Sequence, residues 1–350
     1  RKTLKCPNGI VLGTPGSGKS FFAKREMANA FFATPDHILI LDPENEYTAL
    51  TEQLHGQTIY LAPDSQSYLN PMDLDLSTDV GESPMLMQAD FLLSQCELMM
   101  ASYGNPLMPI EKSLIDRCIS LVYRDYLKNP RPENMPILGD LYQCLREQHN
   151  SRADDLATAM EIYVTGSLSY LNHRTNVDLN NRMVCYNISK LGQGLKKLVM
   201  SNVQKHIWQR TAVNRYAGIT TRIFLDEFHL LLKEPQTAAY TAEIYKRFRK
   251  WNGIPTSLTQ NVKDLLDSSE IENILENSDF VLMLNQGASD RNILAQRLGI
   301  SPQELSHVTN SSEGEGLLFF GDKIIPFEDK FPRDTQLYRV MTTKPSDLAA

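Results

Sequence analysis

An eight-residue segment near the start of the chain constrains the fold more than any other feature. The segment Gly13-Thr14-Pro15-Gly16-Ser17-Gly18-Lys19-Ser20 fits the phosphate-loop pattern G-x-x-x-x-G-K-[S/T]. An apolar run at residues 9–12 precedes it, and residues 21–32 follow with helical spacing. The motif requires this order of strand, loop and helix. The alternative is a chance match within a glycine-rich turn.

The residue types of this segment suit a nucleotide and its metal ion. Glycines let the backbone turn sharply close to a phosphate, and successive N–H groups then face the anion together with the helix N-terminus. Lys19 would reach the β- and γ-phosphates, and the Ser20 hydroxyl would bind Mg²⁺. We therefore predict ATP and Mg²⁺ as cofactors. The predicted nucleotide-binding residues are Gly13, Thr14, Pro15, Gly16, Ser17, Gly18, Lys19, Ser20 and Phe21.

The composition is that of an ordinary globular protein. The chain has 350 residues, which is enough for one large or two medium domains. Of these residues, 42% are hydrophobic and 22% are charged. No apolar run approaches the roughly 20 residues of a membrane span, and no signal peptide is visible. The five cysteines include no C-x-x-C pair, so we expect reduced thiols in a cytosolic protein. Because the chain starts at Arg1 and reaches the phosphate loop almost at once, we expect that an N-terminal part is missing.

Charge is distributed unevenly along the chain. The net charge of −7 argues against a chain that binds nucleic acid over its whole surface. Residues 26–111 contain fourteen acids and no Lys or Arg. Residues 179–225 contain no acid and eight basic residues: Arg182, Lys190, Lys196, Lys197, Lys205, Arg210, Arg215 and Arg222. Each block is either a solvated face or a surface that contacts a neighbouring subunit. The basic block has a further alternative, a surface that binds nucleic acid.

The order of periodic segments predicts a doubly wound α/β sheet with a helical insertion. Short apolar runs predict strands at residues 9–12, 37–43, 57–61, 182–188, 222–228, 255–260 and 280–284. Helical spacing occurs between them at 21–32, 195–216, 236–251 and 290–298, and a hairpin with Gly321 and Asp322 at its turn is predicted at 316–326. Between about residues 83 and 172 there is almost no strand signal, and helical periods occur at 89–103, 110–127, 137–148 and 152–163. We predict a nucleotide-binding domain of residues 1–80 and 178–350 and an all-helical subdomain of residues 81–177.

A second candidate group follows a later strand. The apolar run 222–225 ends in Asp226 and Glu227, the expected second half of a phosphate-loop site. Asp226 would hold Mg²⁺, usually through water, and Glu227 would polarise the attacking water as general base. Glu227 therefore favours hydrolysis over the reaction of a small-molecule kinase. The alternative is a strand that simply ends in surface acids.

Other polar residues also follow predicted strands. Gln260 ends the next strand, where ligand groups gather in an open sheet, so it is a candidate sensor of the γ-phosphate or the lytic water. A loop-capping amide is the alternative. Asp42 and Glu44 follow a strand end as well, and either a place near the site or a structural role in a turn is open.

A basic cluster, YKRFRKW at residues 245–251, precedes the Gln260 strand. Arg249, or failing that Arg247, is our candidate for a finger that reaches the γ-phosphate of a neighbouring subunit. The alternative is a solvated helix end, where cations also interact favourably with the helix dipole.

Taken together, these segments resemble a known family. The chain is similar to the C-terminal ATPase domain of the largest ATPase of type IV secretion and conjugation systems (the TraC/TrbE-like family), within the FtsK–HerA superfamily of P-loop ring motors. The matching segments are GTPGSGKS (13–20), LDPENEY (41–47), the Asn70-Pro71 turn, GSLSYLNHRTNV (166–177), IFLDEFHLLL (223–232), YKRFRKWNGIPTSLTQNV (245–262), NSDFVLMLNQ (277–286) and FPRDTQLYRVMTTKP (331–345). The phosphate loop and the strand that ends in Asp226 and Glu227 are generic to many ATPases, whereas the segments 245–262 and 331–345 are much more specific.

The resemblance implies a RecA-like sheet with an inserted helical subdomain and homo-oligomers up to a hexamer. It implies a cytoplasmic location at the inner membrane beside other secretion-channel components, and a further N-terminal domain. It also gives Lys19 and Ser20 the phosphate and metal roles. Asp226, Glu227 and Gln260 take the metal, base and sensor roles, and Arg249 or a neighbour becomes the finger.

We therefore predict an Mg²⁺-dependent ATPase that powers substrate transfer or pilus assembly in a type IV secretion or conjugation system. A DNA-translocating coupling protein is the first alternative, which the acidic composition disfavours. An assembly scaffold that binds nucleotide with little turnover is the second, and a metabolic P-loop kinase is a distant third.

Overall fold

The computed structural model describes residues 1–76, 83–101, 107–232, 235–260, 274–275, 277–309, 311–344 and 347. The chain divides into two compact units. The first comprises residues 1–58, 180–187 and 213–350, and the second comprises residues 59–179 and 188–212. No helix in the described ranges is both long and apolar enough to cross a membrane.

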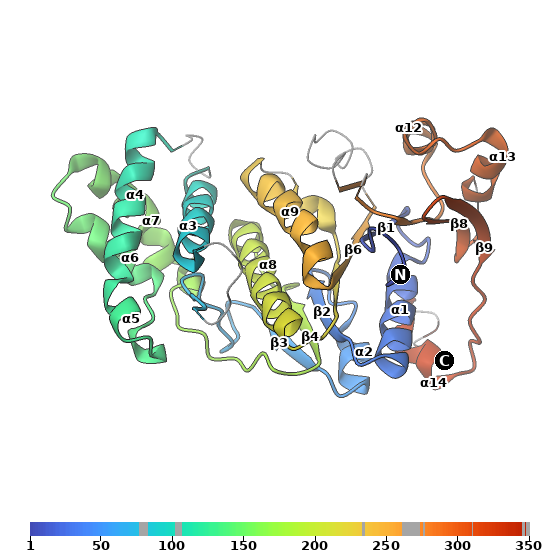
Figure 1. Ribbon diagram of the computed structural model, residues 1–350, viewed down its shortest axis with the longest axis horizontal. Coiled ribbons are helices and arrows are strands. Elements are labelled where there is room, and N and C mark those ends of the chain that lie inside the picture. The colour runs from blue at the N-terminus through green and yellow to red at the C-terminus, as the bar shows by residue number, and fades with distance from the viewer. Residues whose placement is uncertain are drawn as a thin grey trace. The chain divides into compact units, whose positions relative to one another are not determined.

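A nine-stranded sheet is the framework of the fold (Figure 1). Its strands are β1 (Gly9–Leu12), β2 (His37–Asp42), β3 (Gln57–Tyr60), β4 (Met183–Asn187), β5 (Thr221–Leu225), β6 (Gly253–Thr259), β7 (Phe280–Met283), β8 (Glu315–Phe320) and β9 (Lys323–Glu328). They lie in the order β3-β4-β2-β5-β6-β1-β7-β8-β9. All pairs from β4 to β7 are parallel, whereas β8 and β9 are antiparallel additions. The predicted α/β class is confirmed.

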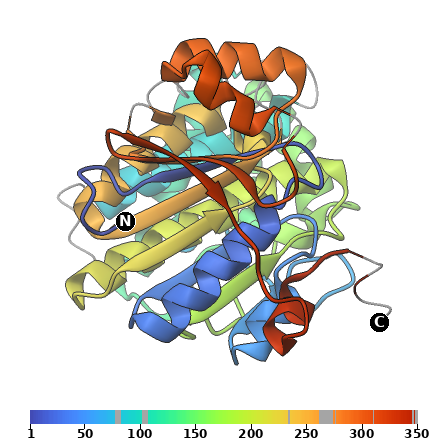
Figure 2. The same ribbon diagram turned by 90° about the vertical axis from the view of Figure 1, so that its right-hand side faces the viewer.

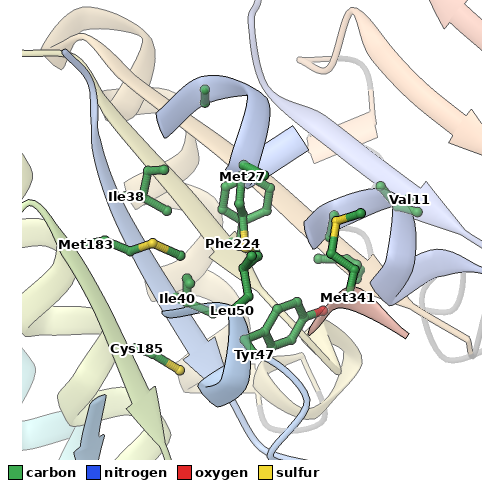
Figure 3. Packing of buried hydrophobic residues seen from close by; sticks show 14 of the residues in the cluster. Val11, Met27, Ile38, Ile40, Tyr47, Leu50, Met183, Cys185, Phe224 and Met341 are labelled. Carbon is green, nitrogen blue, oxygen red and sulfur yellow. The ribbon is translucent and has the colours of Figure 1, made fainter. Parts of the chain in front are cut away.

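The strands of the parallel region are short continuous apolar runs because both of their faces are covered. Every residue of β1 and β7 is buried, as is every residue of β2 from Ile38 onward. Figure 3 shows the core formed on this sheet by side chains of several strands and of α1 (Lys19–Ala33), with Met27 close to Ile38 and Phe224. This packing fixes the strand ends from which the loops of the site emerge.

The remaining helices of the first unit connect or flank these strands. They are α2 (Thr48–Gln53), α9 (Pro235–Phe248), α12 (Ala288–Leu298), α13 (Pro302–Leu305) and α14 (Gln336–Met341), with 3₁₀ turns η3 (Phe228–Leu231), η4 (Arg249–Trp251) and η5 (Ser306–Val308). Helix α8 (Gln193–Tyr216) passes from the second unit into the first.

The second unit contains α3 (Pro84–Ala101), α4 (Pro109–Val122), α5 (Arg124–Lys128), α6 (Leu138–Arg146) and α7 (Ser151–Val164), with 3₁₀ turns η1 (Pro132–Asn134) and η2 (Ser169–Leu171). The end of the predicted helix at Tyr103 lies outside the described residues. The unit also includes residues 59–80 and most of α8, beyond the predicted 81–177. Side chains of α8 make these contacts: Asn202 Nδ2 donates to Leu69 O over 2.8 Å, and Lys205 Nζ donates to Pro71 O over 2.8 Å.

The C-terminal part of the first unit folds back onto α1. The hairpin β8–β9 turns at Gly321, whose φ is +60°, as the sequence predicts. Helix α14, red in Figure 2, then lies beside α2. The buried Lys24 of α1 donates from Nζ to Met341 O over 3.0 Å, which ties α1 to the end of α14.

Much of the predicted basic block is used inside the units. Lys205 is buried on main-chain oxygens, and Arg182 donates to the carbonyls of Phe31, Thr34 and Asp36. Arg222 is paired with Asp36 at 2.9 Å. These three cations therefore neutralise or satisfy internal groups instead of forming an exposed basic face.

Candidate functional site

The order of the strands brings the phosphate loop, the acidic pair and Gln260 to one edge of the sheet. Strands β5, β6, β1 and β7 are parallel neighbours, so their carboxyl ends meet at that edge. The phosphate loop follows β1, Asp226 and Glu227 follow β5, and Gln260 follows β6. Because β6 lies between β5 and β1, Gln260 emerges between the acidic pair and the loop.

The phosphate loop is closed around its own lysine. Lys19 Nζ donates to Gly13 O over 2.8 Å and to Thr14 O over 3.2 Å. Ser17 Oγ donates to Thr14 O, and Thr14 N donates to Asn285 O beyond β7. Gly16 and Gly18 have φ values of +74° and +99°, which L side chains rarely adopt. The two glycines therefore shape the loop.

Lys19 lies in a partly desolvated, acidic environment. Burial lowers the pKa of its ammonium, while the nearby carboxylates of Asp226, Glu227 and Glu46 act in the opposite direction. The charges of the loop lysine and of the β5 acids are thus coupled across the carboxyl edge of the sheet.

Asp226 is buried and held by two donors. Tyr47 Oη donates to its Oδ2 over 3.1 Å, and the Glu227 N–H donates to its Oδ1 over 2.9 Å. Burial raises the pKa of Asp226 to about 7, and the charge of Glu46 adds to this effect. Tyr47 could not be identified from the sequence, because a buried tyrosine after a strand gives no pattern of its own.

Glu227 has a left-handed backbone, with φ of +46°. Its Oε1 accepts a hydrogen bond from Gln260 Nε2 at 3.0 Å, so the candidate base and the candidate sensor are in direct contact. Its Oε2 lies 3.1 Å from His229 Nδ1. His229, two residues after Glu227 in the IFLDEFHLLL segment, was not among the residues expected at the site from the sequence.

Asp42 serves a turn. Its carboxylate accepts from the N–H groups of Glu46 and Tyr47, at 2.9 and 3.0 Å. It therefore fixes the segment that carries Tyr47 to Asp226, while Glu44 is exposed. The turn role of Asp42 left open by the sequence is the one observed.

Two segments far along the chain lie against the loop and its helix. The Gly314 N–H donates to Ser17 O at 3.3 Å, because β8 runs antiparallel to β7 and starts at the edge where β7 ends. The ring of Phe21 lies 5.8 Å from that of Phe331 and 5.5 Å from that of Tyr338. Its side chain therefore contacts the C-terminal segment of the protein.

The two candidate arginines lie at the other edge of the sheet. Arg249 is exposed just before β6, and its Nη1 lies 3.6 Å from Sγ of Cys6, which precedes β1. The seven residues of β6 separate it from Gln260, a span of roughly 20 Å at about 3.3 Å per residue. Arg247 forms an ion pair with Glu243 one helical turn earlier, at 2.9 Å. Arg249 is thus remote from the phosphate loop of its own chain.

Comparison with known proteins assigns the family. Residues 1–314 match the family described as the TraG P-loop domain. The chain belongs to the TraG P-loop domain family. This membership confirms the family resemblance and the P-loop NTPase fold expected from the sequence. No curated protein matches the sequence.

Solved structures share the fold of this TraG P-loop domain. VirB4 of Thermoanaerobacter pseudethanolicus is 24% identical, with a TM-score of 0.84 over 95% of this chain and 91% of that chain. The bacterial conjugative coupling protein TrwBΔN70 with sulphate is 13% identical, with a TM-score of 0.63 over 96% and 88% of the two chains. The plasmid coupling protein TrwB in complex with ADP and Mg²⁺ is 13% identical, with a TM-score of 0.60 over 95% and 88%.

The residues at the carboxyl edge of this TraG P-loop domain fit a nucleotide with Mg²⁺. Among the described residues, no cluster of three or more His, Cys, Asp or Glu side chains could hold a metal ion. Mg²⁺ needs no such cluster, because it usually binds one or two protein oxygens together with phosphates and water. Ser20 and Asp226 supply oxygens of this kind. Burial, and after it repulsion by the carboxylates of Glu46 and Asp42, raises the pKa of Asp226, and a bound cation would relieve that repulsion.

Proposed function

We propose that this chain is an Mg²⁺-dependent ATP hydrolase that powers substrate transfer or pilus assembly in a type IV secretion or conjugation system. The observation that carries the proposal is the contact between Glu227 and Gln260 at the edge where the phosphate loop emerges. A carboxylate beside a candidate γ-phosphate sensor suits activation of water, which a binding scaffold would not require.

In this proposal the residues of the loop bind the phosphates. The loop N–H groups that do not already donate to main-chain oxygens, among them those of Gly16 and Gly18, face the anion, and Lys19 exchanges its bonds to Gly13 O and Thr14 O for phosphate oxygens. Ser20 and Asp226 hold Mg²⁺, which when bound neutralises charge on the phosphates. Tyr47 keeps the Asp226 carboxylate in place through its hydroxyl group.

Glu227 then accepts a proton from the lytic water at Oε1, the oxygen that Gln260 contacts. When Gln260 turns to the γ-phosphate, it releases that oxygen for the water. The presence of the γ-phosphate is thereby linked to the availability of the base.

The site is completed, we infer, by a second copy of the chain. Arg249 is exposed and lies at the opposite sheet edge from its own phosphate loop, so it can supply charge only to a neighbour's nucleotide. Homo-oligomers, up to a hexamer, acting at the cytoplasmic face of the inner membrane beside other secretion-channel components would suit this arrangement. The likeness to VirB4 and to a TrwB structure with ADP and Mg²⁺ supports the nucleotide, the metal and this setting.

ATP hydrolysis measured against protein concentration tests the function. We expect Mg²⁺-dependent turnover that rises in specific activity with concentration and is abolished in Lys19→Ala and Glu227→Gln. Lys323→Ala, an exposed lysine at the start of β9, is the matched control and should keep wild-type turnover.

Two results would contradict the proposal. The absence of turnover at any concentration, despite nucleotide binding, would favour a nucleotide-dependent scaffold. A turnover that appears only with added DNA would favour a DNA-translocating coupling protein. Arg182, Lys205 and Arg222 bind groups within the chain and do not form an exposed basic face, so the DNA-translocating coupling protein is the weaker alternative.

A further inference from the structure

The two carboxylate oxygens of Glu227 have different surroundings. Oε1 accepts the amide hydrogen of Gln260 at 3.0 Å. Oε2 is shielded from solvent, and among the described residues none donates a hydrogen bond of good geometry to it. The nearest polar partner recorded for Oε2 is His229 Nδ1, 3.1 Å away. Among the described residues, Oε2 is therefore closed to a water molecule, and Oε1 is the oxygen that remains for one.

His229 is fixed from two directions. It lies at the beginning of η3, the turn that follows the left-handed Glu227, and its side chain is 11% exposed. Its Nδ1 also lies 3.4 Å from Thr259 Oγ1, and Thr259 immediately precedes Gln260. The imidazole thus joins the end of β5 to the end of β6, the two strands that carry the base and the sensor.

We propose that His229 is a positioning residue for Glu227, a role that rests on the proposed hydrolase function. A glutamate side chain has three rotatable bonds, and a general base must meet the proton it takes within about 3 Å. By occupying the Oε2 end, the ring holds the carboxylate so that Oε1 points to Gln260 and to the lytic water. No proton transfer to or from the ring is required, because the role needs only that Nδ1 stays in close contact with Oε2, at 3.1 Å.

Amide side chains distinguish this role from simple packing. In His229→Asn the amide nitrogen takes nearly the place of Nδ1, whereas in His229→Gln it takes nearly the place of Nε2. We expect His229→Ala and His229→Gln to lower kcat at least about 10-fold and His229→Asn to stay within about threefold of wild type, since small misplacements of a reacting group carry costs of this order. The Kd for ADP should be unchanged in all three, and His307→Asn, at an exposed histidine of η5, should match wild type.

The opposite pattern would overturn the proposal. If His229→Asn loses as much kcat as His229→Ala, the ring acts through its volume and not through Nδ1. If the Kd for ADP rises while kcat stays constant, His229 serves binding and not the base.

A thermal unfolding cycle tests the contact without relying on turnover. We expect the midpoint shifts of His229→Ala and Glu227→Ala to be non-additive in the double variant, because the two side chains are direct neighbours. Additive shifts would refute the positioning role. If the wild-type chain does not hydrolyse ATP, the proposed hydrolase function is wrong. Non-additive shifts would then show only that the two side chains are in contact, and His229 could not be a positioning residue for a catalytic base.

Discussion

Tyr47, which is completely buried, donates its phenolic hydrogen to Oδ2 of Asp226 over 3.1 Å. These residues are 179 positions apart in the sequence and lie in the segments that follow two neighbouring strands, β2 and β5. The contact fixes the oxygen that we propose for Mg²⁺. The position of the metal ligand therefore depends on the turn at Asp42.

Tyr47→Phe removes this donor while keeping the ring. We expect a loss of about 1–3 kcal/mol in the free energy of unfolding, because the lost bond goes to a carboxylate in a buried site. We also expect the Mg²⁺ concentration for half-maximal turnover to rise about 10-fold, as for other residues that orient a metal ligand. Urea unfolding and a Mg²⁺ titration of ATP hydrolysis measure the two effects.

Tyr126→Phe is the control, because this buried tyrosine also loses one hydrogen bond, to Leu74 O at 3.0 Å, in the helical unit. Tyr126→Phe should lower the free energy of unfolding without changing the Mg²⁺ concentration for half-maximal turnover. Equal Mg²⁺ requirements in the two variants would show that Tyr47 does not orient the ligand.

The raised pKa of Asp226 predicts how stability depends on pH in the absence of Mg²⁺ and nucleotide. Between the ordinary value of 3.8 and the folded value of about 7, the folded chain keeps a proton that the unfolded chain has released. The free energy of unfolding contributed by this group therefore falls as pH rises through that window, by at most about 1.4 kcal/mol per pH unit. His206, whose pKa burial lowers to about 4, acts in the opposite sense, so the comparison must isolate Asp226.

Urea unfolding of wild type and of Asp226→Asn in a chelating buffer, from about pH 5 to about pH 8, makes this comparison. The difference in stability between the two should shift in favour of Asp226→Asn as pH rises. A difference that is constant over the range would mean that Asp226 is ionised throughout.

The two left-handed glycines of the phosphate loop differ in how they tolerate a side chain. A Cβ at Gly16 would meet no atom within 4 Å, whereas at Gly18 it would lie 3.3 Å from Cγ of Glu313 and 3.4 Å from the main chain of Gly314. Gly18→Ala adds this contact to a φ of +99°, so we expect it to cost more than the roughly 1–2 kcal/mol of left-handed strain expected for Gly16→Ala. Thermal unfolding of the two variants ranks them. A smaller loss for Gly18→Ala would mean that the segment before β8 yields easily.

Arg222 predicts a large stability effect away from the site. Its guanidinium pairs with Asp36 at 2.9 Å and with Glu26 at 3.2 Å, and the Asp36 side chain is 1% exposed. Arg222→Ala leaves a buried carboxylate short of its partner, so we expect a loss of about 3–5 kcal/mol. Chemical unfolding measures it against Arg333→Ala, an exposed arginine, which should change stability by less than about 0.5 kcal/mol. If Arg222→Ala and Arg333→Ala change stability equally, Lys2, the other partner of Asp36, is sufficient to neutralise the buried carboxylate.

The sequence predicts most of the elements because their patterns are local. Apolar runs form β1, β7 and the centre of β2; the phosphate loop follows β1 directly, and Asp226 and Glu227 follow the apolar end of β5. The hairpin at Gly321 is local as well. Short-range spacing suffices to find features of this kind.

Long-range relationships could not be predicted in the same way. The order of β5, β6 and β1 is set by packing across the sheet, yet this order is what places Gln260 against Glu227. His229 carries no motif until that order is known. Likewise, Arg222 belongs to a basic run in the sequence, and only the tertiary structure shows that it pairs with the buried Asp36.

Arg249 and Gln260 of the same chain lie at opposite ends of β6, which has seven residues. If Arg249 acts on a neighbour's nucleotide, Arg249→Ala and Glu227→Gln should each abolish turnover alone. Mixed in one solution, they should recover part of it, because a subunit with intact Glu227 then meets a neighbour with intact Arg249. Arg247→Ala, whose side chain pairs with Glu243, serves as the control and should stay within about twofold of wild type, since exposed ion pairs contribute little. Recovery of turnover on mixing requires a site shared between subunits, whereas two inactive variants that stay inactive together, in oligomers shown to exchange subunits, would exclude Arg249 as the group that acts in trans.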